Sequence, residues 1–452
     1  MNLDWGHGLA PLTPLAASPA PDPCFPQLAR FHDQGLLAAD LQQALGRRRR
    51  VSAGGELVNV WYIPRKSFRA VYRLPGPPGP RSAGETLLTV QFLPQAEPAA
   101  RQRILDSAAR FGDGVVHLPA WDAIGWRFPA DPQLPNLPAL VKTRRDWSRL
   151  GGPASGPVTW KVLSYLPGER CTVRFTFPDS TNHPAIVGKL EPGGTAEQVH
   201  QWLARLWAEP GRRFQIPRPL GVEPSLGIRW VELVDGLRLD RCWPGARQAA
   251  PLVSLVVEAA AGLHAVPLPD LPVTRAPDVL GRIQRKVLPR IDAVLPALVP
   301  ASTAFFDALA QRAIMLPDRP LRTIHGDLHA ANVLVHGDGV TLVDLDSLAL
   351  GDPAVDLALF GSRLLLLALH RAERLAEAAE LVAGLPEAYA AAGGDPIPAT
   401  TFAWYMAALL VSRQLRTCIR HCAPNLGQLA PALLAIARET LEQGRFTAAV
   451  CQ

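Results

Sequence analysis

Cysteine, long apolar runs and net charge are all scarce in this 452-residue chain. Its six dispersed cysteines fit neither a disulfide framework nor a CxxC metal pair. The most apolar stretch, 364–369, is much shorter than the roughly 20 residues that span a bilayer. The first 22 residues lack the basic and apolar regions of a secretion signal. We therefore expect a soluble, cytoplasmic protein without a membrane span.

Basic residues are only slightly more numerous than acidic ones. The chain has 46 Lys and Arg against 40 Asp and Glu, a net charge of +6, and most arginines stand singly. For the one basic run, 47–50, a solvated linker is favoured over contact with nucleic acid. We expect no nucleic-acid partner, and the sequence leaves the oligomeric state open.

Apolar residues and proline are abundant. The chain is 48% hydrophobic and contains 45 prolines, about twice the average proline share of roughly 5%. Disordered and fibrous proteins are excluded, and the length suffices for two or three packed domains.

The chain divides into four parts by pattern. Residues 1–50 are a Pro-rich lead with a predicted helix at 25–45, and residues 237–452 are mainly helical by their apolar spacing of three and four. Between them, residues 51–150 and 151–236 contain short β-like runs and one helix in the same order. The runs begin at 57, 68, 86, 115 and 125 in the first part and at 158, 171, 185, 214 and 227 in the second.

The two β-rich parts share residues at similar spacing, which predicts a duplicated unit of about 100 residues. Tyr62 matches Tyr165 at an offset of 103, and Gln91 matches Lys189 at 98. A third match aligns Leu118 with Ile216, also at 98. Chance similarity between two small β-rich domains is the alternative.

A β island, 321–360, interrupts the helical part and carries the candidate chemistry. Two short strands joined by a Gly-Asp-Gly turn at 337–339 form a predicted hairpin. This hairpin brings Asp327, Asn332 and Asp344 together at its open end. Such oxygen ligands suit Mg²⁺, and phosphoryl transfer needs mainly positioning and charge neutralisation. The alternative is an Asp-rich surface turn without a ligand, which explains poorly why all three residues occur together.

The island also carries the resemblance to a known family. The segments HGDLHAANVL, LVDLDS and GDPAVDLA resemble the aminoglycoside phosphotransferase and choline-kinase branch of the protein-kinase-like superfamily. The resemblance implies an α+β, bilobal fold with a β-rich N-lobe at 151–236 and a helical C-lobe at 237–452. Residues 51–150 would then be an extra N-lobe-like unit in front. The implied cofactors are Mg²⁺ and ATP or GTP.

By the same resemblance, five residues of the island receive roles. Asp327 matches the catalytic aspartate that orients or deprotonates the acceptor hydroxyl. Asn332 and Asp344 match the Mg²⁺ ligands, and Asp346 stands where a further metal or water ligand occurs. Asp356 resembles a buried aspartate that braces the catalytic loop.

The second β-rich part supplies the implied nucleotide site. Lys189 resembles the lysine that holds the α- and β-phosphates, with Glu197 on the next helix as its expected partner. The backbone from Glu232 to Val234 resembles the hinge that bonds adenine. No GxGxxG occurs in the turn at 166–170, so the choice between ATP and GTP stays open. In the first unit Gln91 stands in place of Lys189, so we expect that unit to be degenerate and to pack on the working lobe.

The acceptor is expected to be a small molecule with a hydroxyl group. Only about a dozen residues separate Asp344 from Asp356, too few for the activation loop on which a peptide substrate lies. Arginines predominate near the C-terminus, which favours a neutral or anionic acceptor such as a sugar over a polycationic aminoglycoside. A solvated helix face is the other explanation for these arginines, which are Arg413, Arg416, Arg420, Arg438 and Arg445.

The alternative function is a nucleotide-binding pseudokinase or regulatory scaffold. Retention of Lys189, Asp327, Asn332 and Asp344 favours the enzyme.

Overall fold

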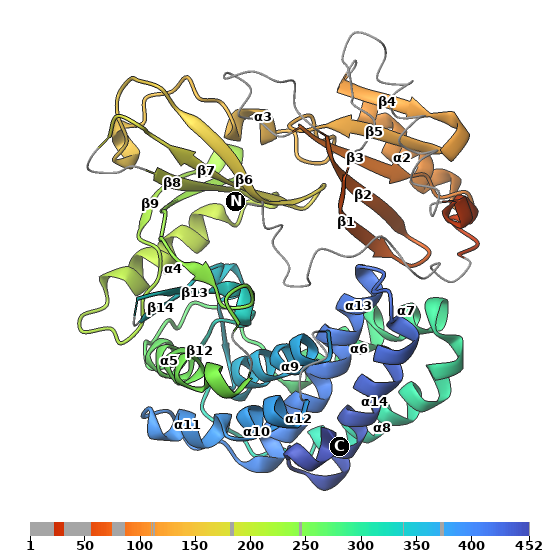
Figure 1. The fold of residues 1–452 in the computed structure, drawn as a ribbon, viewed down its shortest axis with the longest axis vertical. Helices are drawn as coiled ribbons and strands as arrows, with labels where there is room; N and C mark the ends of the chain where they lie inside the picture. The colour runs from red at the N-terminus through yellow and green to blue at the C-terminus, as the bar shows by residue number, and fades with distance from the viewer. Residues whose placement is uncertain are drawn as a thin grey trace.

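The computed structural model describes residues 22–30, 56–74, 86–109, 111, 114–180, 185–243, 246–337, 339–370 and 375–451. Figure 1 shows two β-rich parts side by side above a helical part. Of the helix predicted at 25–45, the described residues contain the 3₁₀-helix η1 (Pro26–Arg30). The remainder of that prediction and the basic run at 47–50 lie outside the described residues.

The first β-rich part is an antiparallel sheet in the order β1-β2-β3-β5-β4. Helix α2 (Pro98–Ala109) connects β3 to β4. The strands are β1 (Glu56–Ile63), β2 (Ser67–Leu74), β3 (Thr86–Phe92), β4 (Val115–Leu118) and β5 (Ala123–Arg127).

The second β-rich part has the same strand order, β6-β7-β8-β10-β9. Helix α4 (Ala196–Ala208) connects β8 to β9, as α2 does in the first sheet. The strands are β6 (Thr159–Leu166), β7 (Arg170–Thr176), β8 (Ala185–Leu190), β9 (Pro219–Glu223) and β10 (Ile228–Glu232). Along β7 buried and half-buried residues alternate, because successive side chains point to opposite faces of a strand.

Strand positions correct one part of the sequence alignment between the two sheets. β1 and β6 differ by 103 at both ends, as predicted. The predicted match of Leu118 with Ile216 is wrong, because Leu118 ends β4 whereas Ile216 precedes β9. Each edge strand is followed by a 3₁₀-turn that starts with proline and ends in a left-handed residue: η3 (Pro119–Trp121) and η5 (Pro224–Leu226). When these two turns are aligned, Leu118 in the first sheet is equivalent to Glu223 in the second.

The helical part is built around α9 (Ala354–His370), whose residues 354–368 are all buried. Two small sheets, β11-β13-β14 and β12-β15, pack against helix α5 (Ala246–His264) of this part. Their strands are β11 (Leu237–Arg238), β12 (Arg322–Ile324), β13 (Val333–His336), β14 (Gly339–Leu342) and β15 (Ala349–Gly351). The other helices are α5 (Ala246–His264), α6 (Ala276–Lys286), α7 (Leu288–Val294), α8 (Val299–Ala313), α10 (Leu375–Ala383), α11 (Leu385–Ala391), α12 (Ala399–Leu409), the π-helix η9 (Leu410–Leu415), α13 (Arg416–Arg420) and α14 (Leu426–Gln443).

The first sheet also contacts the helical part directly. α13 packs against β1, and the ring nitrogen Nδ1 of buried His421 lies 3.0 Å from the Val60 carbonyl oxygen. Arg65 forms a 2.9 Å ion pair with Asp292 of α7. The helical part therefore contacts both β-rich parts (Figure 1).

All six cysteines are free. None of the helices in the described ranges is long and apolar enough to cross a membrane.

Candidate active site

A buried carboxylate holds the loop that carries Asp327. Asp356, in the first turn of α9, is fully buried. It accepts hydrogen bonds from the backbone N–H groups of His325, at 2.7 Å, and Gly326, at 2.9 Å. It also lies 3.0 Å from Nε2 of His264, whose Nδ1 is 2.9 Å from the Tyr389 hydroxyl. The core of the helical part thus fixes the backbone directly before Asp327.

Gly326 allows this loop to turn sharply. Its φ is +73°, in the left-handed region that side chains other than glycine's disfavour. A Cβ atom here would clash with the carbonyl oxygen of Ser347, in the segment after Asp344. Glycine is therefore needed both for the turn and for the close approach of two segments of the site.

Asp327 faces basic groups at the end of the loop. Its Oδ1 lies 3.5 Å from Nη1 of Arg413, and its Oδ2 lies 3.7 Å from Nε2 of His329. Burial raises the pKa of Asp327, but His329 and Arg413 together hold it below its usual value. The Asn332 amide nitrogen donates to the Asp327 carbonyl oxygen at 3.0 Å, which ties the two predicted site residues together.

His329 is neutral at physiological pH. Burial lowers its pKa to about 4, against the opposing effect of Asp327. The ring accepts a hydrogen bond from the Ala331 backbone through Nδ1, at 3.2 Å. His329 therefore contacts the Asp327 carboxylate as an uncharged group.

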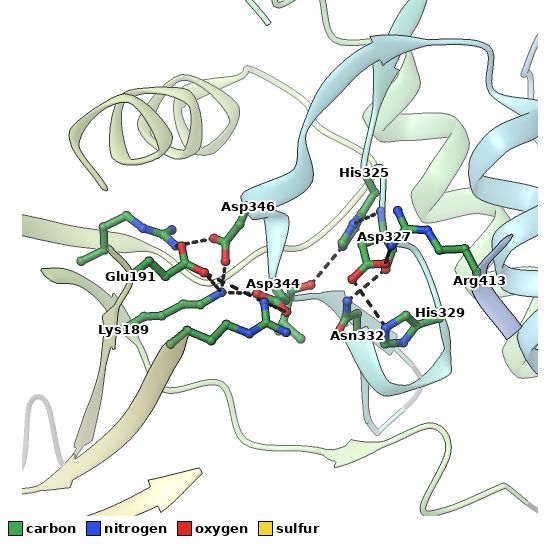
Figure 2. A network of polar contacts seen from close by, with 12 residues as sticks. Lys189, Glu191, His325, Asp327, His329, Asn332, Asp344, Asp346 and Arg413 are labelled. Atoms are coloured by element: carbon green, nitrogen blue, oxygen red, sulfur yellow. Dashed lines mark hydrogen bonds and ion pairs between the residues drawn. The ribbon is translucent and has the colours of Figure 1, made fainter. Parts of the chain in front are cut away.

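Asp344 lies between Asp327 and Lys189, as Figure 2 shows. It follows β14 with φ +63° and ψ +47°, a strained conformation for a residue with a side chain. Its carboxylate contacts Lys189 and lies 3.5 Å from Nη1 of Arg170. Burial raises the pKa of Asp344, but these two cations hold it well below its usual range.

Lys189 and the neighbouring Arg229 hold two further carboxylates. Lys189 lies 3.3 Å from Glu191 and contacts Asp346. Arg229 lies directly opposite Lys189 in the pairing of β10 with β8. It also binds Glu191, at 3.1 Å, and Asp346. Its side chain is only 4% exposed, so both carboxylates are needed to compensate the buried charge.

The structure brings five of the eight predicted site residues into one region. These are Lys189, Asp327, Asn332, Asp344 and Asp346. Among the described residues, the carboxylates within ion-pair distance of Lys189 are those of Glu191, Asp344 and Asp346.

The predicted partner of Lys189, Glu197, does not take part in this region. Glu197 is exposed in the first turn of α4, so the expected pair is wrong, and Glu191 occupies the position of its partner.

The predicted hinge lies at the end of β10. The Glu232 backbone N–H donates to the Arg218 carbonyl oxygen at 2.9 Å. Val234 lies in the connection between β10 and β11. Both residues are half-buried.

Four residues of the site were not predicted: Arg170, Glu191, Arg229 and, as a neighbour of Asp327, Arg413. Arg229 carried a usable signal, because it is a charged residue inside the apolar strand sequence IRWVE. Glu191 follows Lys189 by two residues, which places both on the same face of an extended chain.

The donor set fits a hard divalent cation. In the part of the chain that the structure describes, no group of three or more His, Cys, Asp and Glu side chains is arranged to hold a metal ion. Asp344 and the Asn332 amide oxygen would therefore bind Mg²⁺ together with phosphate oxygens and water, which is the coordination Mg²⁺ prefers. Asp346 contacts Lys189 and Arg229 instead.

The family model of the phosphotransferase enzyme family matches residues 172–393. Residues 172–393 are thus similar to this family over slightly less than half of the chain. All eight predicted site residues lie within this range. The predicted resemblance is confirmed, and with it the prediction of a small-molecule kinase.

An aminoglycoside 3'-phosphotransferase from Streptomyces ribosidificus is 27% identical over 220 residues, which are 44% of this chain and 78% of the relative. Two solved structures are similar over most of their length. A choline kinase from Cryptosporidium parvum has a TM-score of 0.44 and 12% identity, covering 63% of this chain and 89% of its own. An amicoumacin kinase has a TM-score of 0.46 and 14% identity, covering 64% and 89%. The assignment rests on the family model.

Replacing Gly326 by alanine should destabilise the protein. The strained φ alone costs about 1–3 kcal/mol, and the contact with the Ser347 carbonyl adds to it, so Gly326→Ala lowers the thermal unfolding midpoint. Gly427 is the matched control, since it is exposed in α14 and a Cβ atom at this position would have nothing within 4 Å. Gly427→Ala should raise stability by up to about 1 kcal/mol. Equal midpoints for the two variants would contradict the assigned turn.

Proposed function

We propose that this protein is an ATP- or GTP-dependent phosphotransferase that moves the γ-phosphoryl group to a hydroxyl of a small neutral or anionic molecule such as a sugar. The observation that carries the proposal is the line of groups from Lys189 through Asp344 to Asp327 (Figure 2). A cation for phosphates, an ionised metal ligand and an ionised acceptor-binding carboxylate occur in the order that phosphoryl transfer requires.

In the proposed reaction Asp327 accepts a hydrogen bond from the acceptor hydroxyl. The acceptor oxygen forms a bond to the γ-phosphorus while the bond to the β–γ bridging oxygen breaks, and the nucleoside diphosphate leaves with that electron pair. The hydroxyl proton passes to an Asp327 carboxylate oxygen. Because the pKa of Asp327 is low, this proton transfer comes late, and the main contribution of the side chain is orientation.

The remaining predicted residues bind the nucleotide in this proposal. Lys189 would exchange its contact with Asp344 for the phosphates, while Arg229 keeps Asp346 and Glu191 in place. Mg²⁺, bound by Asp344 and Asn332, would neutralise charge on the transferred group. Since the Glu232 N–H already donates to Arg218, we expect Val234 to provide the backbone donor to the base.

A small acceptor is favoured over a peptide by the segment after Asp344. Between Asp344 and Asp356 the chain forms a 3₁₀-turn, η8 (Leu345–Ser347), and the strand β15, which pairs with β12. Every part of this segment is engaged in the fold, so none can act as an activation loop.

We further propose that residues 22–127 are a degenerate copy of the N-lobe unit 131–232. Supporting this, strand pairing in the two sheets places Gln91, Leu93 and Ile124 at the positions of Lys189, Glu191 and Arg229. Each ionic group of the nucleotide site has thus been replaced by an uncharged one, and the copy has no means of binding phosphates.

Both units begin with a similar segment, DPCFPQL at 22–28 and DPQLPNL at 131–137. The first aspartate of each segment forms hydrogen bonds with the first hairpin of its unit, and we call this arrangement the aspartate clamp. The Asp22 Oδ2 accepts from the Tyr62 hydroxyl and the Arg65 N–H, at 2.7 and 2.8 Å. Asp131 Oδ2 accepts from the Tyr165 hydroxyl and the Gly168 N–H, both at 2.7 Å. These clamps move the proposed boundary between the units from residue 150 to about residue 130.

The first unit also holds the turn of the β6–β7 hairpin, which faces the nucleotide phosphates in this proposal. Arg69 of β2 donates to the Pro167 carbonyl oxygen and, at 2.8 Å, to the Gln133 side chain. We propose that these bonds replace the missing glycine-rich motif by fixing the turn from outside. The first unit then serves as structural support for the nucleotide site.

Asp327→Ala should reduce turnover by at least about 10²-fold, the lower end for loss of a positioned acid–base group. Asp344→Asn should weaken Mg²⁺–nucleotide binding by at least about tenfold, since loss of a group that only supports a metal ligand already costs that much. Turnover is measured with labelled ATP or GTP, Mg²⁺ and a panel of sugars, amino alcohols and aminoglycosides. Mg²⁺–nucleotide binding is measured by calorimetry. Asp318→Ala, at a side chain 97% exposed, is the control. Nucleotide binding without transfer to any acceptor and without hydrolysis would favour the pseudokinase.

Gln91→Ala should leave kcat/KM nearly unchanged, because Gln91 stands in place of Lys189 in a unit that binds no phosphates in this proposal. Lys189→Ala should lower kcat/KM by more than about 10²-fold, the loss typical of one electrostatic contact to a reacting group. Activities are compared per folded protein, with folding checked by thermal unfolding, since Gln91 is buried. A large loss in Gln91→Ala would show that Gln91 itself takes part in the active site.

Asp131→Ala should raise the KM for the nucleotide several-fold and leave kcat within a small factor, because the hairpin turn loses two hydrogen bonds and moves. Asp22→Ala is the matched control: it breaks the corresponding clamp of the first unit and should reduce stability alone. Steady-state kinetics at a temperature well below the unfolding midpoints of both variants separates the effect on KM from the effect on stability. If both variants raised KM equally, the special role of the second clamp would be wrong.

A further inference from the structure

Basic side chains gather on two helical faces next to Asp327. On one side the residues are spaced by four, and they lie on the consecutive helices α6 and α7; on the other side they are spaced by three and four, and they lie on the consecutive helices η9 and α13. α13 packs against α7, which brings the two faces together. The six side chains are Arg282 and Lys286 on α6, Arg290 on α7, Arg413 on η9, and Arg416 and Arg420 on α13.

These charges lie close enough to repel one another. Burial lowers the pKa of Arg416 to about 9, with further lowering by Arg420, Arg413, Arg290 and Arg282. Burial and Arg290 lower the pKa of Arg420 to about 10, with Glu169 opposing. Such values are far from the usual arginine pKa above 12. The cluster therefore holds its positive charge at a cost in free energy.

Much of the hydrogen-bonding capacity of the cluster is unused within the described part of the chain. The Nε atoms of Arg413, Arg416 and Arg420 and one terminal nitrogen of Arg290 are buried without a hydrogen-bond partner. Nearby carboxylates act on some members: Asp327 and Asp278 on Arg282, and Glu169 on Arg290 and Arg420. By contrast, exposed Arg438 on α14 has its own partner, Glu442, at 3.7 Å.

The cluster starts at the acceptor end of the site and extends toward the first sheet. Arg413 connects it to the reaction centre, with Nη1 3.5 Å from Asp327 Oδ1 and Nη2 3.4 Å from the Gly326 carbonyl oxygen. At the far end Arg420 lies over the Trp61 ring of β1, 3.9 Å from its centre. Figure 1 shows α13 between α7 and β1, below the two sheets.

Several arginines with unpaired buried N–H groups beside the Asp327 carboxylate select for anions. A polycationic acceptor would be repelled, and a neutral one would leave the buried guanidinium groups uncompensated. The planar guanidinium group binds phosphate and carboxylate oxygens in pairs, and the excess of positive charge favours a dianion over a monoanion.

We propose that the acceptor carries a phosphate group of its own, bound by these six basic side chains, while Asp327 orients a hydroxyl of the same molecule. This proposal rests on the proposed phosphotransfer function and names its substrate class: a phosphate monoester of a polyol or sugar. The product is then a bisphosphate. The first sheet contacts this cluster through Trp61, whose ring lies under Arg420, which gives the extra unit a place beside the acceptor site as well as beside the nucleotide site.

Calorimetry on the full chain tests binding directly. With Mg²⁺ and a non-hydrolysable ATP analogue saturating the nucleotide site, inorganic phosphate and glycerol phosphate should bind saturably, and glycerol should not. Arg416→Gln and Arg290→Gln should each weaken phosphate binding by tenfold or more. Arg438→Gln, the exposed control, should leave it unchanged. Equal phosphate binding in all three variants would overturn the proposal.

Thermal unfolding separates a binding role from a structural one. Without ligand, Arg416→Gln removes a buried and repelled charge, so its unfolding midpoint should equal or exceed that of the unmodified protein. A clear fall in the midpoint would show that the cluster serves the fold and would overturn the proposal. Adding phosphate should raise the midpoint of the unmodified protein more than that of the variant.

Turnover distinguishes this proposal from the one on which it rests. Pairs of polyols and sugars, each with and without a phosphate group, should differ in kcat/KM by a hundredfold or more in favour of the phosphorylated member. Equal or faster turnover of the neutral members would overturn the phosphate site and leave the phosphotransfer function intact. Absence of both nucleotide binding and turnover would instead defeat the proposed function itself.

Discussion

The ion-pair network between the second sheet and the segment after β14 is the interaction on which the arrangement of the site depends. Three cations from neighbouring strands, Arg170, Lys189 and Arg229, meet Asp344 and Asp346 of the helical part, with Glu191 between them. Breaking one contact leaves a buried charge uncompensated. The network therefore sets the distance between the second sheet and the segment that carries Asp344 and Asp346.

A second, independent constraint fixes the other side of the site. Asp356 and Gly326 hold the loop before Asp327 against α9 and against Ser347. Asp327 is thus positioned by the buried helix α9, whereas Asp344 is positioned by ion pairs. In the proposed reaction, a rigid backbone on one side and exchangeable ion pairs on the other would let the nucleotide enter and leave while the acceptor geometry stays constant.

The sequence predicted what depends on local spacing and missed what depends on strand pairing. Asp327, Asn332 and Asp344 could be located because one hairpin carries all three. Glu197 was wrong because position in a helix does not reveal which face turns to solvent, and α4 turns Glu197 outward. Arg229 could not be assigned, since it reaches Lys189 only when β10 pairs with β8. The common strand order of the two sheets was predictable from the 103-residue spacing, but the edge strands were misaligned because the connections after α2 and α4 differ in length.

The second aspartate clamp has a mechanical consequence. Asp131 follows β5 of the first sheet within a few residues, yet its carboxylate accepts a hydrogen bond from the β6–β7 turn of the second sheet. Arg69 of β2 donates a hydrogen bond to the same turn. A hinge motion that separated the sheets would have to break these bonds together. The two sheets are therefore coupled to one another, and a displacement of the first sheet is transmitted directly to the β6–β7 turn.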